Sequence, residues 1–349
     1  MRVKLVRIYL KLELDRTAKI RYRTLHQNMK NEHPHPDRIC WIDAARVIAI
    51  LLVMQAHTPI SGLFNHDSEG GAVALFFLLS GFFAQRGTFT AVLQRLGCLL
   101  PFYITWVTYG LLVMNHGFNF SLSMYWDTLL HGSSNGMWFI LYLIYFTIIG
   151  GVALQIPLIL RICISVALIA YGAYQGIAEN VIHPCMNIYY GLGVYLLGQL
   201  AHRIKPSEWK HYLFPSHTTM RWTPACILII ILLLSAINAN PIPSWLLIWV
   251  SSWAILGTAV AIDATAPTLG TALARLGESV VFVYAIHMAT LRMMISAYLR
   301  FTGTMPSYMV SAAFILLLFV AASWFYFTIR GKWAVTDLFL FARWRKSTK

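Results

Sequence analysis

The chain has 349 residues, of which 58% are hydrophobic and only 11% are charged, and its mean hydropathy is +0.63. Soluble globular proteins carry about 25% charged residues, so this composition excludes that class and indicates a polytopic membrane protein. Basic cytoplasmic loops held against anionic lipid explain the net charge of +14, and no folded basic domain with base-stacking aromatic residues points to nucleic-acid binding.

The N-terminal segment is basic and lacks an apolar core followed by a small-residue cleavage site. We therefore expect no cleaved signal peptide, and insertion by the first transmembrane helix. Residues 1–38 are predicted to form a basic cytoplasmic tail, 39–330 a single transmembrane domain, and 331–349 a basic C-terminal tail. Two histidines in the first tail, His33 and His35, alternate with prolines. They lack a fixed coordination geometry, so no metal site is expected.

Apolar segments long enough for membrane helices follow the first tail. A bilayer core of ~30 Å needs about 20 apolar residues per helix. By this measure the sequence predicts ten spans, at 40–60, 70–85, 95–115, 137–155, 157–175, 186–202, 223–239, 243–262, 278–298 and 307–329. The second is short, and "QIPLILRI" (155–162) between the fourth and fifth fits either a tight turn or a kink. Nine or eleven spans therefore remain open.

The distribution of basic residues predicts the orientation. If the N-terminus is cytoplasmic, all but three of the 27 Lys and Arg fall in the two tails and the inner loops. The exceptions are Arg46 and Arg292 within spans and Arg300 in an outer loop. This is a positive-inside pattern. The predicted fold class is all-α, with about ten transmembrane helices and both termini cytoplasmic.

The first span, "RVIAILLVMQAH", has Arg46 at one end and His57 at the other. Eleven helical residues make three turns plus about 20°, so the two side chains share one face about 16 Å apart. Such groups are costly inside a membrane. In a structural interpretation, Arg46 pairs with Asp43 and reaches the cytoplasmic interface, and His57 is a satisfied interior histidine. In a functional one, the helix presents a cation to one ligand and a proton acceptor to another. Spacing alone leaves both open.

Five motifs occur in order along the chain: "WIDAARVIAILLVMQAH", "VALFFLLSGFF", "RLGCLLPFYITW", "MWFILYLIYF" and "LARLGESVVFVYAIH". Together they resemble the successive motifs of the membrane acyltransferase 3 family over about residues 38–330. The residues that match the family's motifs are Arg46, His57, Phe76, Phe77, Ser80, Gly81, Phe82, Arg95, Pro101, Phe102, Trp138, Phe139, Tyr284 and His287.

The resemblance implies an activity. The family moves an acyl group, usually acetyl, from a coenzyme A thioester to a hydroxyl of an extracytoplasmic glycan or lipid-linked sugar. It thus implies acyl-CoA, with acetyl-CoA preferred, as the donor co-substrate, such a sugar as the acceptor, and a multi-pass location in the cytoplasmic (inner) membrane. Donor phosphates need cationic partners. We expect these from Arg46, Arg86 and Arg95, with the loop cations Arg203, Lys205 and Lys210 on the same side.

His57 is the predicted catalytic residue, together with Arg46. A neutral histidine can remove the proton of the attacking hydroxyl, which is worth about 10²–10⁴ in rate. In a competing version, His57 carries the acyl group covalently.

Four further residues are candidates for the substrate pocket, each beside a simpler interpretation. For Ser80 close helix packing is preferred over a pocket wall, and for Trp138 an interface belt is preferred. Tyr284 and His287 share a helix face and fit a buried hydrogen-bonded pair. The sequence also departs from the family. Arg86 and Arg95 are separated by eight residues, and His131 lies seven residues before Trp138, so no role passes to His131.

A transporter or flippase of a small polar solute or glycan is the alternative function, because intramembrane Arg and His also serve as relay or binding residues. Transporters are often built from inverted repeats. No such correspondence is visible, which favours the enzyme. A sensing or scaffolding domain without chemistry is a third interpretation. The acceptor, the acyl length and the oligomeric state do not follow from the sequence.

Overall fold

A computed structural model describes residues 39–58, 67–85, 87–115, 117, 120–132, 136–178, 187–204, 208–209, 220–236 and 243–343. The predicted N-terminal tail with its histidines, and the cations Arg86, Lys205 and Lys210, lie outside these residues. In the part that is described, all regular secondary structure is helical, which confirms the all-α fold class.

Each of the ten predicted spans contains a helix. The helices are α2 (Cys40–Ala56), α4 (Asp67–Phe82), α5 (Phe89–Met114), α7 (Trp138–Ala153), α8 (Leu158–Ala178), α9 (Ile188–Ala201), α11 (Thr223–Ala236), α12 (Ser244–Thr265), α14 (Val280–Thr302) and α15 (Tyr308–Ile329). Between α7 and α8 the chain makes a tight turn, in which the Gln155 N–H donates to the Val152 carbonyl at 3.0 Å. The turn settles the choice left open by "QIPLILRI".

The helices differ in length relative to a bilayer. Among the described residues, five helices are long and apolar enough to cross a membrane: α5, α8, α12, α14 and α15. The other predicted spans hold helices of 14 to 17 residues, which reach about 21–26 Å. The chain is thus a multi-pass membrane protein by its helices, and the count of ten crossings and the orientation of the termini stay predictions.

Within the described residues, three helices lie where the sequence predicted no span: α6 (Leu122–His131), α13 (Pro267–Leu276) and α16 (Ala334–Phe341). Proline at the first position of α13 suits a helix start. The last helix forms within the predicted C-terminal tail. There the ring centroid of Phe341 lies 4.7 Å from that of Tyr326 and 5.2 Å from that of Phe282. All three helices are too short for a search by apolar length to detect.

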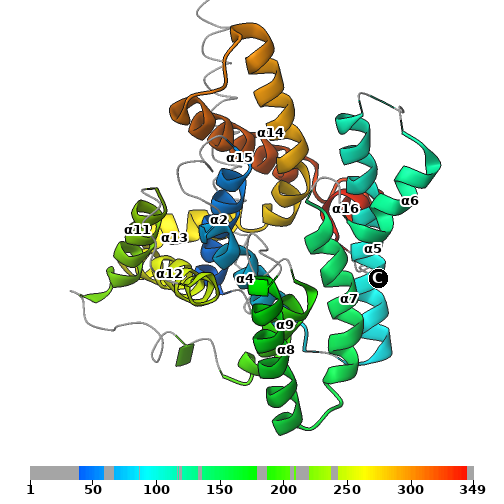
Figure 1. Ribbon diagram of the computed structural model, residues 1–349, viewed down its shortest axis with the longest axis vertical. Coiled ribbons are helices and arrows are strands. Elements are labelled where there is room, and N and C mark those ends of the chain that lie inside the picture. The colour runs from blue at the N-terminus through cyan, green and yellow to red at the C-terminus, as the bar shows by residue number, and fades with distance from the viewer. Residues whose placement is uncertain are drawn as a thin grey trace, which may run out of the picture. The chain divides into compact units, whose positions relative to one another are not determined.

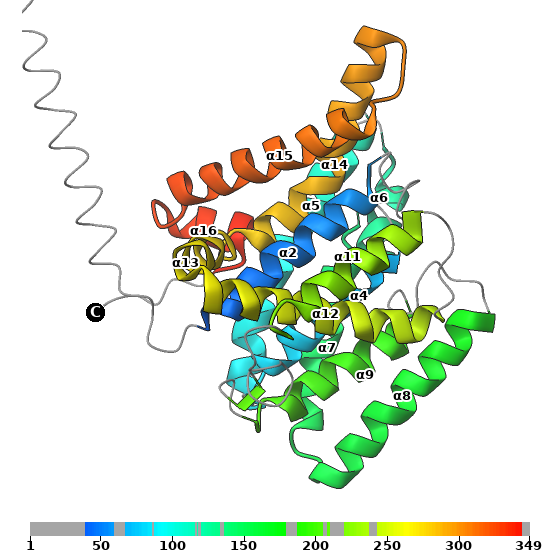
Figure 2. The ribbon, with the colours of Figure 1, turned by 90° about the vertical axis from the view of Figure 1, so that its left-hand side faces the viewer.

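Helix α2 is surrounded by other helices. It contacts α4, α12, α13 and α14, and Figure 2 shows it running between α12 and α14. Ala44, Ala45 and Ala49 are fully buried in it. Small side chains allow this close packing of helices in a membrane. The residues at both ends of α2 are thereby held against neighbouring helices.

Helices α4 and α9 pack closely against each other at the second motif, and Figure 1 shows them next to each other. A methyl group added to Gly81 would overlap the backbone carbonyl of Tyr195, and one added to Gly198 would overlap that of Leu78. Glycine is required at both positions because the obstacle is backbone. The packing interpretation of the Ser80–Gly81 segment is therefore supported at Gly81.

Candidate active site

His57 lies one residue beyond the end of α2. Its backbone N–H donates to the Met54 carbonyl at 3.2 Å, and the Thr58 hydroxyl donates to the Gln55 carbonyl at 2.9 Å. These bonds hold the turn that leaves the helix. About 25% of the His57 side chain is exposed, so the imidazole is accessible while its backbone is fixed.

Glu69, in the first turn of α4, approaches His57 from the opposite chain direction. Its Oε1 lies 3.6 Å from His57 Nε2, and the residue is 7% exposed. A carboxylate is favoured at a helix N-terminus by the unpaired backbone N–H groups there. Sequence reasoning missed Glu69, because this residue falls in the polar segment between the predicted spans 40–60 and 70–85. The available signal was a carboxylate just before an apolar helix.

His287 of α14 completes the cluster. Its ring centroid lies 5.1 Å from that of His57, although the two residues are 230 positions apart. Its Nδ1 lies 2.5 Å from the backbone carbonyl of Tyr284, one turn earlier on the same helix. A neutral imidazole in this position donates from Nδ1, so Nε2 carries the lone pair.

The Nε2 of His287 is the unusual atom of the cluster. The residue is 1% exposed, and Nε2 has no hydrogen-bond partner among the described residues. Buried polar atoms in native proteins normally have a partner, and an exception at a site suggests a place for a ligand group. Here that group would be a hydrogen-bond donor, such as a hydroxyl.

Aromatic rings from two further motifs form a wall beside the histidines. The ring centroid of Phe139 lies 5.1 Å from that of Tyr284 and 4.6 Å from that of Phe77. The ring centroids of Trp138 and Phe77 are 6.4 Å apart. The Tyr284 hydroxyl donates to the carbonyl of Gly136, just before α7. Tyr284 and His287 do meet, as predicted, with ring centroids 5.4 Å apart. Their hydrogen bonds differ from the expectation, because each side chain bonds a backbone carbonyl.

The structure does not bring the other predicted residues to this cluster. Arg46 Nη1 forms an ion pair with Asp43 Oδ1 at 3.1 Å, which is the contact that the structural interpretation predicts. It lies about 16 Å along α2 from His57. Ser80 lies eleven residues, or about three turns, along α4 from Glu69. Arg95 donates to the Phe83 carbonyl at 2.9 Å and joins α5 to the end of α4.

His131, which received no role from the sequence, lies on α6 with its side chain 67% exposed and pairs with Asp127 at 3.0 Å. Within the described ranges, no group of three or more His, Cys, Asp or Glu side chains is arranged to hold a metal ion.

The cluster can perform proton transfer. Glu69 faces Nε2 of His57, so an Nε2–H can point at the carboxylate when the imidazole accepts a proton. The carboxylate then stabilises the imidazolium that results. His287 Nε2 offers a second acceptor for the same incoming group. Two proton acceptors and one carboxylate at the end of a membrane helix suit a base-catalysed attack by a hydroxyl.

Comparison with known proteins gives one match. A family model described as an acyltransferase domain matches residues 39–330, which include all five motifs and every residue of the cluster. No curated protein and no solved structure matches the chain.

Proposed function

Because the chain belongs to the membrane acyltransferase 3 family, we propose that it moves an acyl group, with acetyl preferred, from cytoplasmic acyl-CoA to a hydroxyl of an extracytoplasmic glycan or lipid-linked sugar. The observation that carries the proposal is the cluster of His57, Glu69 and His287, with Nε2 of His57 3.6 Å from the Glu69 carboxylate. The proposed location is the cell inner membrane.

His57 is the proposed general base. The acceptor hydroxyl gives its proton to the His57 imidazole as its oxygen forms a bond to the thioester carbonyl carbon. The carbon–sulfur bond then breaks, and the departing coenzyme A thiolate takes the proton from His57. Glu69 orients the ring and stabilises the charged imidazolium between these steps.

His287 is the proposed second contact to the acceptor. Its buried Nε2 has a lone pair and no partner in the described part of the chain, so it can accept a hydrogen bond from a sugar hydroxyl. The neighbouring aromatic wall, with Trp138 and Tyr284, gives a sugar an apolar surface on which to stack. Ser80 lies too far along α4 to take part here, and its proposed pocket role gives way to packing.

The donor's phosphates are assigned to the opposite end of α2 and α4. The resemblance assigns them to Arg46, Arg86 and Arg95. Two observations support a common location for Arg46 and Arg95: the first lies near the start of α2, and the second bonds the end of α4. Since α2 and α4 reverse direction between His57 and Glu69, these ends lie on the same side of the helix pair.

The test uses acetyl-CoA that is labelled in its acetyl group. It measures transfer of the label into envelope glycan or lipid, in membranes that contain wild type or His57→Ala at matched levels. We expect transfer by the wild type and its loss in the variant. His131→Ala is the matched control, because that histidine is exposed on α6 and pairs only at the surface. Absence of transfer from both acetyl-CoA and succinyl-CoA would contradict the proposal.

Covalent transfer through an acyl-His57 intermediate is the competing version. It predicts an acyl adduct on a His57-containing peptide when the enzyme is trapped with donor in the absence of acceptor. The base mechanism predicts no such adduct. Mass spectrometry of the trapped, digested protein distinguishes the two.

A further inference from the structure

A second site lies at the other end of α4 and α7, about 20 Å along α4 from Glu69. Here a cavity of about 600 Å³ is lined by polar residues that include Gln85, Arg161, Gln199 and Arg203. An apolar groove of about 340 Å³ adjoins it between α7, α8 and α9. Arg161 lines both hollows. Charge and apolar surface thus meet at one side chain.

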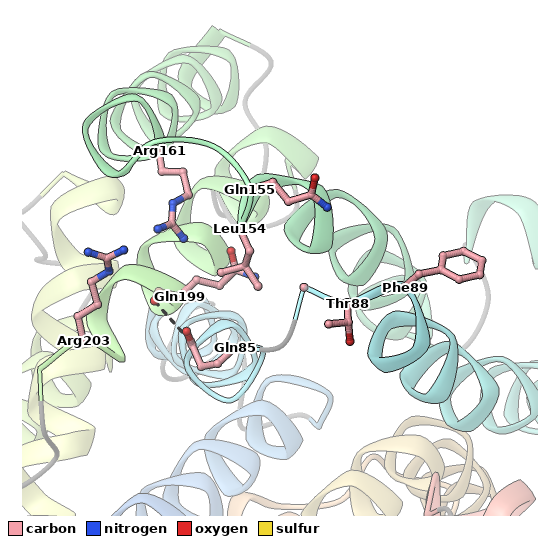
Figure 3. A pocket seen from close by; sticks show the side chains of 9 residues that line it. Gln85, Thr88, Phe89, Leu154, Gln155, Arg161, Gln199 and Arg203 are labelled. Carbon is pink, nitrogen blue, oxygen red and sulfur yellow. Dashed lines mark hydrogen bonds between the residues drawn. The ribbon is translucent and has the colours of Figure 1, made fainter.

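Two cations, Arg161 and Arg203, line the cavity. Arg161 on α8 is 5% exposed, and its Nε has no hydrogen-bond partner in the part of the chain that the structure describes. Arg203 follows the end of α9, and Figure 3 shows its guanidinium group turned towards that of Arg161. The two like charges repel each other. Among the described residues, neither arginine forms an ion pair. A buried cation normally has a counter-charge, and the described residues supply none to Arg161.

A second unsatisfied atom faces the same space. Gln199 donates from Nε2 to the carbonyls of Ala84 and Gly150 at 3.2 and 3.3 Å, but its Oε1 is buried and has no partner among the residues described. The cavity therefore offers cationic donors for an anion and, beside them, one acceptor. A phosphate next to a hydroxyl group satisfies both.

The groove supplies the apolar part of the same ligand. Its wall contains Ile149 and Val152, which are 43% and 61% exposed, and it follows α8 from Arg161 to Leu168. That path is two turns, or about 10 Å. Since α8 is long and apolar enough to cross a membrane, the exposed wall of the groove faces lipid. A hydrocarbon chain lying along α8 would fill it.

We propose that Arg161 and Arg203 bind the phosphate of an anionic phospholipid whose head group carries hydroxyls, with one acyl chain in the groove between α7, α8 and α9. Basic pockets between membrane helices are suited to such head groups. Acyl-CoA fits less well, because the groove faces away from the helix bundle and a donor with a short acyl group would leave it empty. The site is separate from the histidine cluster.

The experiment measures lipid binding to the full-length chain in detergent by native mass spectrometry. Phosphatidylglycerol and phosphatidylcholine with identical acyl chains are titrated separately. We expect phosphatidylglycerol to bind the wild type at least about tenfold more tightly. Arg203→Gln and Arg161→Gln should each weaken it about tenfold, the loss of one charge-assisted contact. Arg300→Gln, which removes an exposed arginine at the end of α14, is the matched control and should change nothing.

Two variants keep the test independent of folding at the buried arginine. Arg203 is exposed, and Val152→Trp fills the groove without altering charge. Both should weaken phosphatidylglycerol binding. Equal binding of the two lipids, or equal loss in Arg300→Gln, would overturn the proposal. So would binding of free coenzyme A that is lost in Arg203→Gln while phosphatidylglycerol binding persists, because the cavity would then belong to the donor. Acyl transfer is not part of this readout, so the two proposals fail separately.

Discussion

Replacement of Glu69 by glutamine tests the centre of the proposed mechanism. The change keeps the shape of the side chain and one oxygen that can accept from His57, but it removes the negative charge. At 3.6 Å between Nε2 and Oε1, two unit charges attract by about 4–5 kcal/mol at an effective dielectric constant of 20. His57 is 25% exposed, so solvent reduces this value, and we take about 2–3 kcal/mol as the effective loss.

The loss applies to the step in which His57 is charged. A loss of about 2–3 kcal/mol lowers kcat roughly 30- to 150-fold. The KM for acetyl-CoA should change little, because the donor phosphates are assigned to the other end of α2. The assay is label transfer in membranes at matched protein levels, with acceptor in excess and acetyl-CoA varied.

Asp127→Asn is the matched control for Glu69→Gln. It neutralises the carboxylate of the other His–carboxylate pair, in which both side chains are 67% exposed, and should leave kcat within about twofold because exposed pairs contribute little. If Glu69→Gln retains wild-type kcat while His57→Ala abolishes transfer, Glu69 does not stabilise the imidazolium. A matched loss in Asp127→Asn would show that the effect is not local to the cluster.

Three other variants test separate parts of the structure. His287→Phe keeps a ring and removes the unpartnered Nε2, so kcat should fall about tenfold or more; unchanged kinetics would exclude a contact with the acceptor. Arg46→Gln should raise the KM for acetyl-CoA about tenfold with kcat nearly unchanged, whereas a change in thermal stability alone would leave Arg46 a structural partner of Asp43. Gly81→Ala meets the backbone of Tyr195 and should lower the free energy of unfolding by about 1–3 kcal/mol. Its control is Gly97→Ala, where the added methyl meets nothing within 4 Å, and the two are compared by thermal denaturation in detergent.

The helices were largely predictable from the sequence, because apolar length is a local property. All ten predicted segments contain a helix. The search by apolar length found no signal for α6, α13 and α16, which are short and partly polar. It also made the spans at α7, α9 and α11 longer than the helices are, whereas the span at α4 was already predicted to be short. Contacts with neighbouring helices, which composition does not encode, fix where such helices end.

The active-site cluster was predictable only in part. The Arg46–His57 spacing and the Tyr284–His287 pair follow from helical periodicity within single helices. The 5.1 Å approach of His57 to His287 depends on how α2 and α14 pack, and no local pattern specifies it. Glu69 lay in a segment that its polarity assigned to a loop. Without that carboxylate, the sequence offered His57 no orienting partner.

The spacing of Arg46 and His57 gains its meaning from the helix that packs beside it. Helix α4 carries Glu69 in its first turn, at the His57 end, and beyond its far end the Phe83 carbonyl accepts a hydrogen bond from Arg95. The proton acceptors therefore lie at the His57 end of this antiparallel helix pair, and the cations lie at the opposite end. A donor held by its phosphates at the cationic end must extend about 16–20 Å along the helices to bring its thioester to His57. A long, flexible thioester can meet this requirement, whereas a compact acyl donor held at the same end cannot. With the donor phosphates at the proposed cationic end, the length of α2 favours a donor with a long arm between its phosphates and its reactive carbon.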